Sequence, residues 1–167
     1  IIFRKRVVRR AQSRKERFLK DTAVLLADFF AQDDLARLTA DAGELLDCPL
    51  MVIDDAFRVA AHYAPPGFTD PLFDRAVQQG AITYEAGAII SRSPALSAGA
   101  PDYVEVTDST RRRRFAPLIS AGLRLGYLVC VDIDGHLADI PAETFRTVEY
   151  GAVPHSQNAG GLRCPTG

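Results

Sequence analysis

The apolar residues near the start of the chain recur at helical spacing. Between Phe18 and Phe30 they follow one another without an intervening Pro or Gly, which predicts a helix. A second amphipathic segment begins after Asp33 and Asp34, either of which can cap a helix, and ends before Pro49. Its inward face is formed by Leu35, Leu38, Ala42, Leu45 and Leu46. Two consecutive helices are therefore expected.

The pattern then changes from helical spacing to short β-rich runs. Residues 50–54 and 57–62 are two such runs joined by turn formers, which predicts a hairpin. A stretch rich in Pro and Gly follows, and a helix is predicted from about Asp70 to Gly80, because Gly commonly closes helices.

A further turn or two of helix is expected over 83–90, and SPALSAGAP, residues 93–101, is expected to be a loop. Three more strands are then predicted, over 103–107, about 112–120 and about 123–133, the last two joined by a turn at Ala121 and Gly122. In the last strand alternation gives way to the apolar run LGYLVCV, which is typical of a strand buried on both faces. This strand is expected in the middle of the sheet.

Pro141 is expected to open a closing helix as its first residue, with Phe145, Val148 and Tyr150 facing inward. Beyond Tyr150 the apolar periodicity is lost, and residues 151–167 are predicted to be an irregular tail. Strands segregated into one antiparallel sheet, with helices from both chain ends, predict an α+β domain.

Composition agrees with one globular domain. The 167 residues, of which 47% are hydrophobic and 25% charged, suffice for a single hydrophobic core. We expect a basic N-terminal arm or helix extension over 1–20, a domain over 21–150 and the tail over 151–167.

Charge separates the arm from the domain. Residues 1–20 carry nine Lys or Arg against one Glu, so they are strongly basic, and the total of −1 leaves the remainder acidic. The arm permits nucleic-acid binding through phosphates, but it has no recognised nucleic-acid-reading motif. A solvated or coiled-coil helix is the favoured interpretation. Homodimerisation is predicted through helices 18–46, with Leu25, Phe29 and Leu38 as candidate contacts.

Cysteine usage and hydropathy bear on location. The three cysteines are widely spaced, which disfavours a disulfide framework and a CxxC zinc pattern, and Cys48 and Cys130 are expected to act as small buried residues. The apolar stretch 23–31 is too short to span a membrane and contains Asp28. A cytoplasmic protein without membrane contact is expected.

Catalytic templates are missing from the chain. It has no Walker loop, HExxH or GxSxG motif, so neither an enzyme nor a cofactor is predicted. Asp132, Asp134 and His136 alternate near a strand end and have the chemistry of metal ligands. No fourth ligand accompanies them in sequence, so the favoured interpretation is that they end the strand and that no metal binds.

Three segments carry a family resemblance. PLMVIDDAFRVAAH, DPLFDRAVQQG and RRFAPLISAGLRLGYLVCVD resemble the GAF-like sensor domain that precedes a helix-turn-helix in bacterial transcriptional regulators of the PucR and CdaR type. The resemblance covers roughly 21–150. Its most specific part is APLI, a turn with Gly122 and then LGYLVC, in which Gly126 and Tyr127 match the Gly-Tyr that the family has before its central strand. The helix-turn-helix of those regulators is not present in this chain.

The resemblance implies a GAF/PAS-like antiparallel sheet that holds a small molecule under a cover formed here by about 63–102. The candidate ligand-binding residues are His62, Tyr63, Phe68, Tyr84, Arg112, Arg114, Phe115 and Tyr127. The alternative is that the aromatic residues pack against each other as core. Residues 111–114 are four consecutive arginines, of which at most two can share a face of a strand. Two interpretations are open for this run: it binds an anion, or it is the solvated start of a strand.

The expected function is a regulatory sensor module that binds a small-molecule effector, or relays a signal, to a DNA-binding domain absent from this chain. DNA contact is expected only through that domain. The alternative is a ligand-free dimerisation or interaction scaffold with the same fold.

Overall fold

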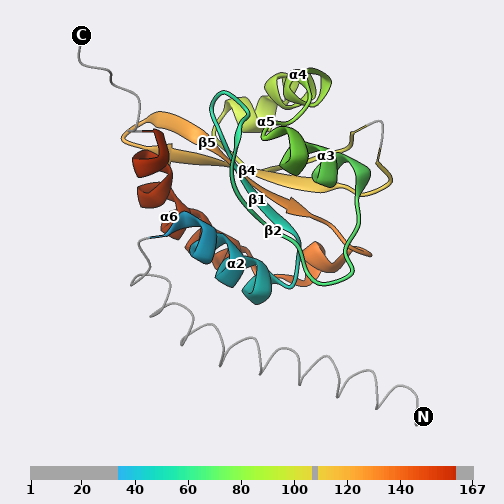
Figure 1. Ribbon diagram of the computed structural model, residues 1–167. Helices are drawn as coiled ribbons and strands as arrows, with labels where there is room; N and C mark the ends of the chain where they lie inside the picture. The colour runs from blue at the N-terminus through green and yellow to red at the C-terminus, as the bar shows by residue number, and fades with distance from the viewer. Residues whose placement is uncertain (1–33, 107–108, 161–167) are drawn as a thin grey trace.

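Residues 34–106 and 109–160 are described by a computed structural model of the chain (Figure 1). The predicted helix 18–30, the basic arm 1–20, and the candidate dimer contacts Leu25 and Phe29 lie outside these ranges and stay predictions.

The centre of the domain is one antiparallel sheet. Its strands are β1 (Leu50–Asp54), β2 (Val59–Tyr63), β3 (Asp102–Val104), β4 (Arg113–Ser120) and β5 (Leu123–Val131), in the spatial order β2-β1-β5-β4-β3. β5, which contains the run LGYLVCV, pairs with β1 on one side and β4 on the other. The predicted central position of this strand is confirmed.

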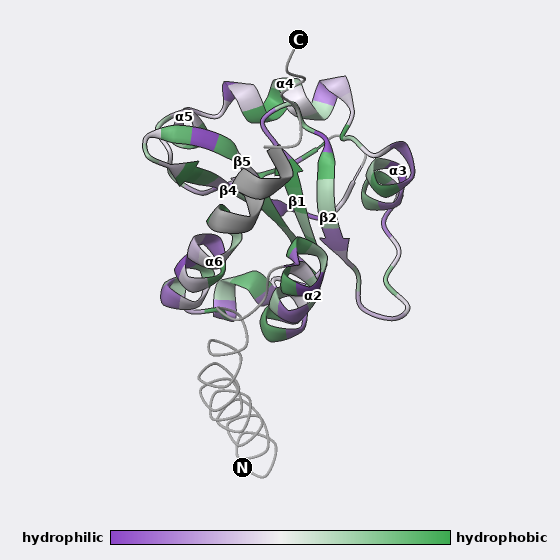
Figure 2. Cartoon of the chain, turned by 60° about the vertical axis from the view of Figure 1, so that its left-hand side comes forward, coloured by the Kyte–Doolittle hydropathy of each residue, from purple (hydrophilic) through white to green (hydrophobic). Residues whose placement is uncertain are grey.

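Helices cover both faces of the sheet. Figures 1 and 2 show α2 (Leu35–Leu46) and α6 (Ala142–Gly160) together on one face, and α3 (Pro71–Gln79), α4 (Tyr84–Arg92) and the short α5 (Pro94–Ser97) on the other. A 3₁₀ turn, η1 (His136–Asp139), precedes α6. The predicted α+β class is confirmed. Within the described ranges, no helix is both long and apolar enough to cross a membrane.

The sheet separates two apolar cores, because side chains alternate along each strand. Leu50 and Val52 of β1 pack into the core under α2 and α6, whereas Met51 and Ile53 pack into the core under α3 to α5. We call these the α2/α6 core and the α3/α4 core. Leu38, a candidate dimer contact, is only 1% exposed within the α2/α6 core. Burial corrects that expectation, because a second copy cannot reach this side chain.

Gly126 allows the two central strands to pair closely. Its φ of 155° is unusual for other residues, and a Cβ atom placed on it would lie 2.0 Å from the carbonyl oxygen of Ile53 in β1. Gly126 also faces Leu118 where the register of β4 against β5 shifts. The Gly in the Gly126-Tyr127 pair therefore has a structural reason within the sheet.

Helix caps explain which helical predictions succeed. The side chain of Asp34 accepts a hydrogen bond from the Ala36 amide and begins α2. Asp70 begins α3 in the same way, and Gly80 closes it with a φ of 70°. The predicted helix over 83–90 is α4, capped by Thr83.

Two boundaries differ from prediction. The expected loop 93–101 contains α5, since Ser93 caps its start and Pro94 follows at a favoured first position. The predicted strand 103–107 shortens to β3, which pairs with β4 through only three residues.

The closing helix also continues beyond its predicted end. α6 extends to Gly160, so residues 151–160 are helical rather than irregular. Ala152 lies four residues after Val148 and is buried beside it in the α2/α6 core, which extends the inward face by one turn. Tyr150, expected to face inward, is instead 80% exposed.

Candidate functional site

A small cavity lies between the sheet and helices α3 and α4, where the cover over 63–102 was expected. Its volume is about 40 Å³, room for roughly three water molecules. The lining residues come from the sheet, from α3 and α4, and from the segments beside them: Met51, Leu72, Phe73, Ala76, Ile82, Thr83, Ala86, Val106, Arg113, Phe115, Val129 and Val131. Among these, Arg113 alone carries a charge.

Arg113 brings a buried cation to the wall of this apolar cavity. The residue is 5% exposed, and its guanidinium donates to the carboxylate of Asp70 and, at 2.9 Å, to the carbonyl of Arg111. Burial lowers the pKa of Arg113, and the opposing charge of Asp70 partly restores it. The ion pair keeps a full charge inside the domain, which a buried arginine without a partner could not do at acceptable cost.

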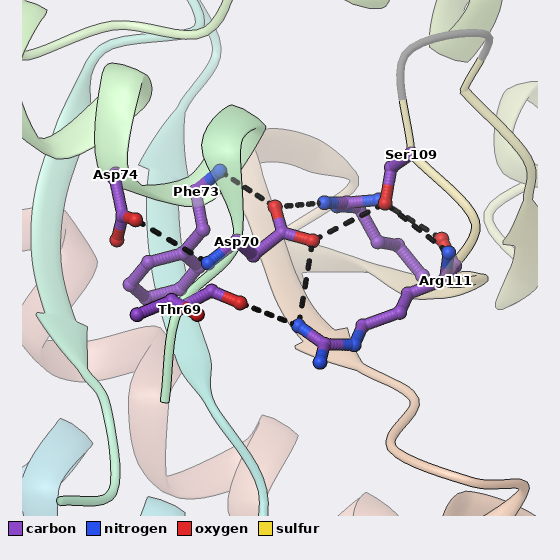
Figure 3. Close-up of polar contacts among 7 residues, drawn as sticks. Thr69, Asp70, Phe73, Asp74, Ser109 and Arg111 are labelled. Atoms are coloured by element: carbon purple, nitrogen blue, oxygen red, sulfur yellow. Dashed lines mark hydrogen bonds and ion pairs between the residues drawn. The ribbon is translucent and has the colours of Figure 1, made fainter. Parts of the chain in front are cut away.

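Asp70 has two tasks at once. As the N-cap of α3 it accepts the Phe73 amide at 2.9 Å, while the same carboxylate pairs with Arg113 and accepts the Ser109 hydroxyl at 3.2 Å. Figure 3 shows this carboxylate at the centre of the contacts from Phe73, Ser109 and Arg111.

The contacts of Asp70 set its ionisation. Burial raises the pKa of this carboxyl. The hydrogen bond from the Phe73 amide, the charge of Arg113 and the hydrogen bonds from Arg113 and Ser109 together lower it by more, so the net pKa is below its ordinary value. Asp70 therefore remains a carboxylate in the folded domain near neutral pH.

Arg111 ties the loop before α3 to the start of β4. It donates to the Thr69 carbonyl at 2.7 Å, its guanidinium lies 5.1 Å from the ring centre of Phe68, and it approaches Asp70 at 3.9 Å. The candidate residue Phe68 therefore lies near the cavity, with its ring edge-on to that of Phe73 at 5.5 Å.

The structure places the two candidate arginines away from the cavity. Arg114 points to the opposite face, where it pairs with Glu149 of α6 at 2.7 Å and stacks on Phe145 at 3.9 Å. Arg112 is half exposed, stacks on Tyr103 and pairs with Asp132 at 3.2 Å. The four arginines do divide between the two faces of the sheet, as expected. The two on the α3/α4 side are Arg111 and Arg113, not the predicted Arg112 and Arg114.

The candidate aromatic residues divide between the faces. Phe115 lines the cavity, and Tyr127, 1% exposed, packs in the same core against Phe115 and Phe57. His62 is on this face too, 6.4 Å from the ring of Phe73, but its side chain is exposed at the surface.

Two other candidates lie elsewhere. Tyr63 packs with the α2/α6 core, where its ring occupies the space that a side chain at Gly43 would need. Tyr84 is the first residue of α4 and is 89% exposed. Tyr63 pairs with Leu50 of β1 and shares its face of the sheet, and Tyr84 is not among the buried residues of α4, which are Gly87 and Ile90.

A second, open groove of about 560 Å³ lies beside the loop before α3 and includes Asp134 and His136. The His136 Nε2 atom is 3.0 Å from the Leu46 carbonyl oxygen, and Asp132 accepts the Leu137 amide at 3.1 Å. Both residues thus anchor the turn after β5. The described residues contain no cluster of three or more His, Cys, Asp or Glu that could hold a metal.

Cys48 and Cys130 are fully buried in the α2/α6 core, as expected of small apolar residues. A hydrogen bond with Cys130 and burial both raise the pKa of Cys48, so this thiol stays protonated and unreactive in the folded domain.

Solved structures show what this arrangement is similar to. The chromophore-binding domain of bacteriophytochrome RpBphP3 from R. palustris aligns with a TM-score of 0.55 at 11% identity, over 89% of this chain and 62% of that one. The GAF domain of an Acinetobacter phosphoenolpyruvate-protein phosphotransferase aligns with a TM-score of 0.50 at 9% identity, over 88% and 96%. The fold is GAF-like. Free methionine-R-sulfoxide reductase from Neisseria meningitidis also aligns, with a TM-score of 0.48 at 16% identity, over 84% and 91%.

No family model matches the chain, and no curated protein matches it. The GAF-like fold confirms the architecture implied by the sequence resemblance, whereas the affiliation with PucR and CdaR-type regulators stays a prediction. At these identities the comparison concerns the fold alone, so function has to be argued from the site.

Proposed function

We propose that this GAF-like domain is a regulatory sensor module that binds a small molecule between the sheet and helices α3 and α4. The observation that carries the proposal is the cavity with one buried cation, Arg113, in an otherwise almost wholly apolar wall. Ligand sites typically combine an apolar lining with a few placed polar groups.

The cover of the cavity is lightly anchored, which supports ligand entry. α3 buries only Phe73 and Ala76, and α4 buries only Gly87 and Ile90. On the opposite face α2 alone buries six residues. Segments with few buried contacts open at low free-energy cost, so α3 and α4 can move outward to enlarge a cavity that is small in the closed domain.

The sheet supplies a route for the signal. Arg113 contacts the cavity and Asp70, and the next residue, Arg114, contacts Glu149 of α6 on the other face. A ligand that favours one arrangement of α3 would thereby bias α6. In the proposed context α6 passes this bias to a dimer and to a DNA-binding domain outside this chain.

The proposal is tested by thermal unfolding of the full chain against about a millimolar each of nucleotides, nucleobases, amino acids, sugar acids and short organic acids. A ligand at a hundred times its dissociation constant adds about 2.7 kcal/mol, equivalent to an increase of about 5 °C or more. The variant Ala86→Leu narrows the cavity from α4 and should abolish the shift. Ala60→Leu, at an exposed position on β2, should retain it.

The small volume of the cavity favours a second candidate, a ligand-free dimerisation scaffold whose aromatic residues fill their own core. This function predicts no shift with any compound and a stable dimer by light scattering. Removing residues 1–32, which include the predicted helix 18–30, then tests whether that segment holds the dimer, because an unchanged oligomer would exclude it.

A further inference from the structure

Arg113 defines the chemistry that the cavity can recognise. Its guanidinium is the charged group of a wall whose other residues, apart from Thr83, are apolar. Guanidinium groups pair with carboxylates through charge-assisted hydrogen bonds. A molecule that complements this wall has an anionic end and a compact apolar body.

We propose that the ligand is a small organic acid whose carboxylate replaces that of Asp70 at Arg113 and thereby releases the N-cap of α3. This inference rests on the sensor function proposed above and adds the ligand class and the first step of the response.

In the absence of such a ligand, the carboxylate of Asp70 binds the Arg113 guanidinium in its place. It is 2% exposed and comes from the cover, whereas Arg113 comes from the sheet. Two carboxylates on one guanidinium repel each other in a buried site. Binding is therefore an exchange of one carboxylate for another.

The surroundings offer the displaced carboxylate a new partner. Arg111 already lies 3.9 Å from Asp70, and its side chain is 37% exposed. The other charged group beside Asp70 is Asp74, whose carboxylate accepts the Asp70 amide at 3.3 Å. An outward movement of Asp70 toward Arg111 keeps its charge paired and opens the side of Arg113 that it had filled.

The exchange has a defined consequence for α3. The Phe73 amide loses its acceptor when the Asp70 carboxylate leaves, because the same oxygen atom binds both Phe73 and Arg113. A helix that loses its N-cap frays at its first turn. Ligand binding is thereby converted into loosening of the start of α3.

The experiment compares acids with their neutral amides. Acetate, isobutyrate, isovalerate and benzoate, each with its matched amide, are titrated into the full chain by calorimetry and by ¹⁵N NMR. We expect at least one acid to bind about tenfold or more tightly than its amide, since a hydrogen bond to a charged group contributes that much. The Phe73 amide resonance should shift on binding.

Variants separate exchange from simple binding. Asp70→Asn keeps a helix-capping side chain but removes the competing charge, so it should bind the acid about tenfold more tightly and the amide unchanged. The double variant D70N/R113M removes both members of the ion pair, which avoids a buried unpaired charge, and should lose the preference for acid over amide. Arg92→Met, at an exposed arginine of α4, is the matched control and should behave as the wild type.

The outcomes distinguish the two proposals. Equal binding of acid and amide, or an unchanged preference in D70N/R113M, overturns the organic-acid inference and leaves the sensor function standing. If no acid or amide binds but another class of compound in the wider panel raises the unfolding temperature, the organic-acid inference is overturned and the sensor function stands. If no compound binds in the titrations and none raises the unfolding temperature in the panel, both the inference and the sensor function are overturned.

Discussion

Asp70 shows how one side chain can join local and tertiary structure. Its carboxylate caps α3 and also neutralises Arg113, 43 positions further along the chain. The cap is a local interaction that short-range sequence pattern predicts, and the predicted helix did begin at this residue. The ion pair depends on the placement of α3 over β4, which the sequence does not display.

The lowered pKa of Asp70 predicts a pH-dependent contribution to stability. A carboxyl whose folded pKa is below its unfolded value, about 3.9, stabilises the fold fully above that value and loses the effect as pH falls toward the folded pKa. Asp70→Asn should lower the free energy of unfolding by about 3 kcal/mol at pH 7. The difference from wild type should shrink below about pH 4.

Urea unfolding from pH 7 to pH 3 measures this difference. Asp55→Asn, at an exposed turn position, serves as the control and should follow the wild type at every pH. A constant difference between D70N and wild type across the range would show that Asp70 does not stabilise through its charge.

The arginine run illustrates the limit of inference from sequence for single residues. Alternation along a strand correctly indicated that the four arginines divide between faces. It also places Arg111 and Arg113, not Arg112 and Arg114, on the same face as Phe115, which was itself a candidate for the cavity. The selection of Arg112 and Arg114 was inconsistent with that parity. What the sequence did not indicate is that Asp70 packs opposite Arg113.

At the scale of elements, the β4–β5 hairpin depends on two glycines with different requirements. Gly122 lies in the turn with a φ of 78° and open space around it. Gly126 lies against the backbone of Ile53 in β1, where a Cβ atom has no room. The first requires only backbone freedom, and the second also requires the absence of a side chain.

Alanine substitution should separate these requirements. Gly122→Ala should cost about 1–2 kcal/mol, the strain of a positive φ, with the sheet unchanged. Gly126→Ala should cost about 3 kcal/mol or more, because the backbone of β1 must also shift. Chemical denaturation gives both values, and ¹⁵N NMR of β1 should change in the second variant alone. Equal costs would contradict the close approach.

Elements were predicted well where local chemistry marks their ends. Asp34, Asp70 and Gly80 are such marks, and the corresponding boundaries agree with the structure. The end of α6 was missed because the glycine at Gly151 suggested a stop, although Ala152 continues the buried face. Tertiary burial overrode a weak local signal there.

At the scale of the whole molecule, β4 connects the two cores through consecutive ion pairs. Arg113 fastens the cover through Asp70, and Arg114 fastens α6 through Glu149. The Arg114 side chain also lies over the ring of Phe145 in α6. A change in the position of β4 therefore affects both faces.

Removing the charge of Glu149 should loosen α6 while leaving the cavity intact. Glu149→Gln weakens a largely buried charge-assisted hydrogen bond, with an expected loss of about 1–3 kcal/mol. Hydrogen exchange should increase in α6 more than in α3. Glu143→Gln, at an exposed position in the first turn of α6, is the control and should have little effect. Equal acceleration in both helices would show that the domain responds only as one unit.

The fold class and the central strand were predictable because apolar run length and alternation report burial directly. The cavity was predictable only as a region, the cover over 63–102. Its decisive pair, Asp70 and Arg113, is absent from the predicted site because both residues have adequate local explanations, a helix cap and a strand start. Only their proximity in space suggests a shared role.

Because residues 111–114 are four successive arginines, the ion pairs of β4 can still form after a one-residue shift in its register. If β4 slipped so that Arg112 took the place of Arg113, Arg112 would stand opposite Asp70 and Arg113 opposite Glu149, whereas the opposite slip would put Phe115 opposite Glu149. Charge alone cannot exclude the first of these registers. Phe115 can, since the same slip would carry its ring out of the α3/α4 core and into the α2/α6 core, where the small Ala116 now packs. During folding, the attraction between these charges would bring β4 and the helices together, and the size of the Phe115 ring would select the register of β4.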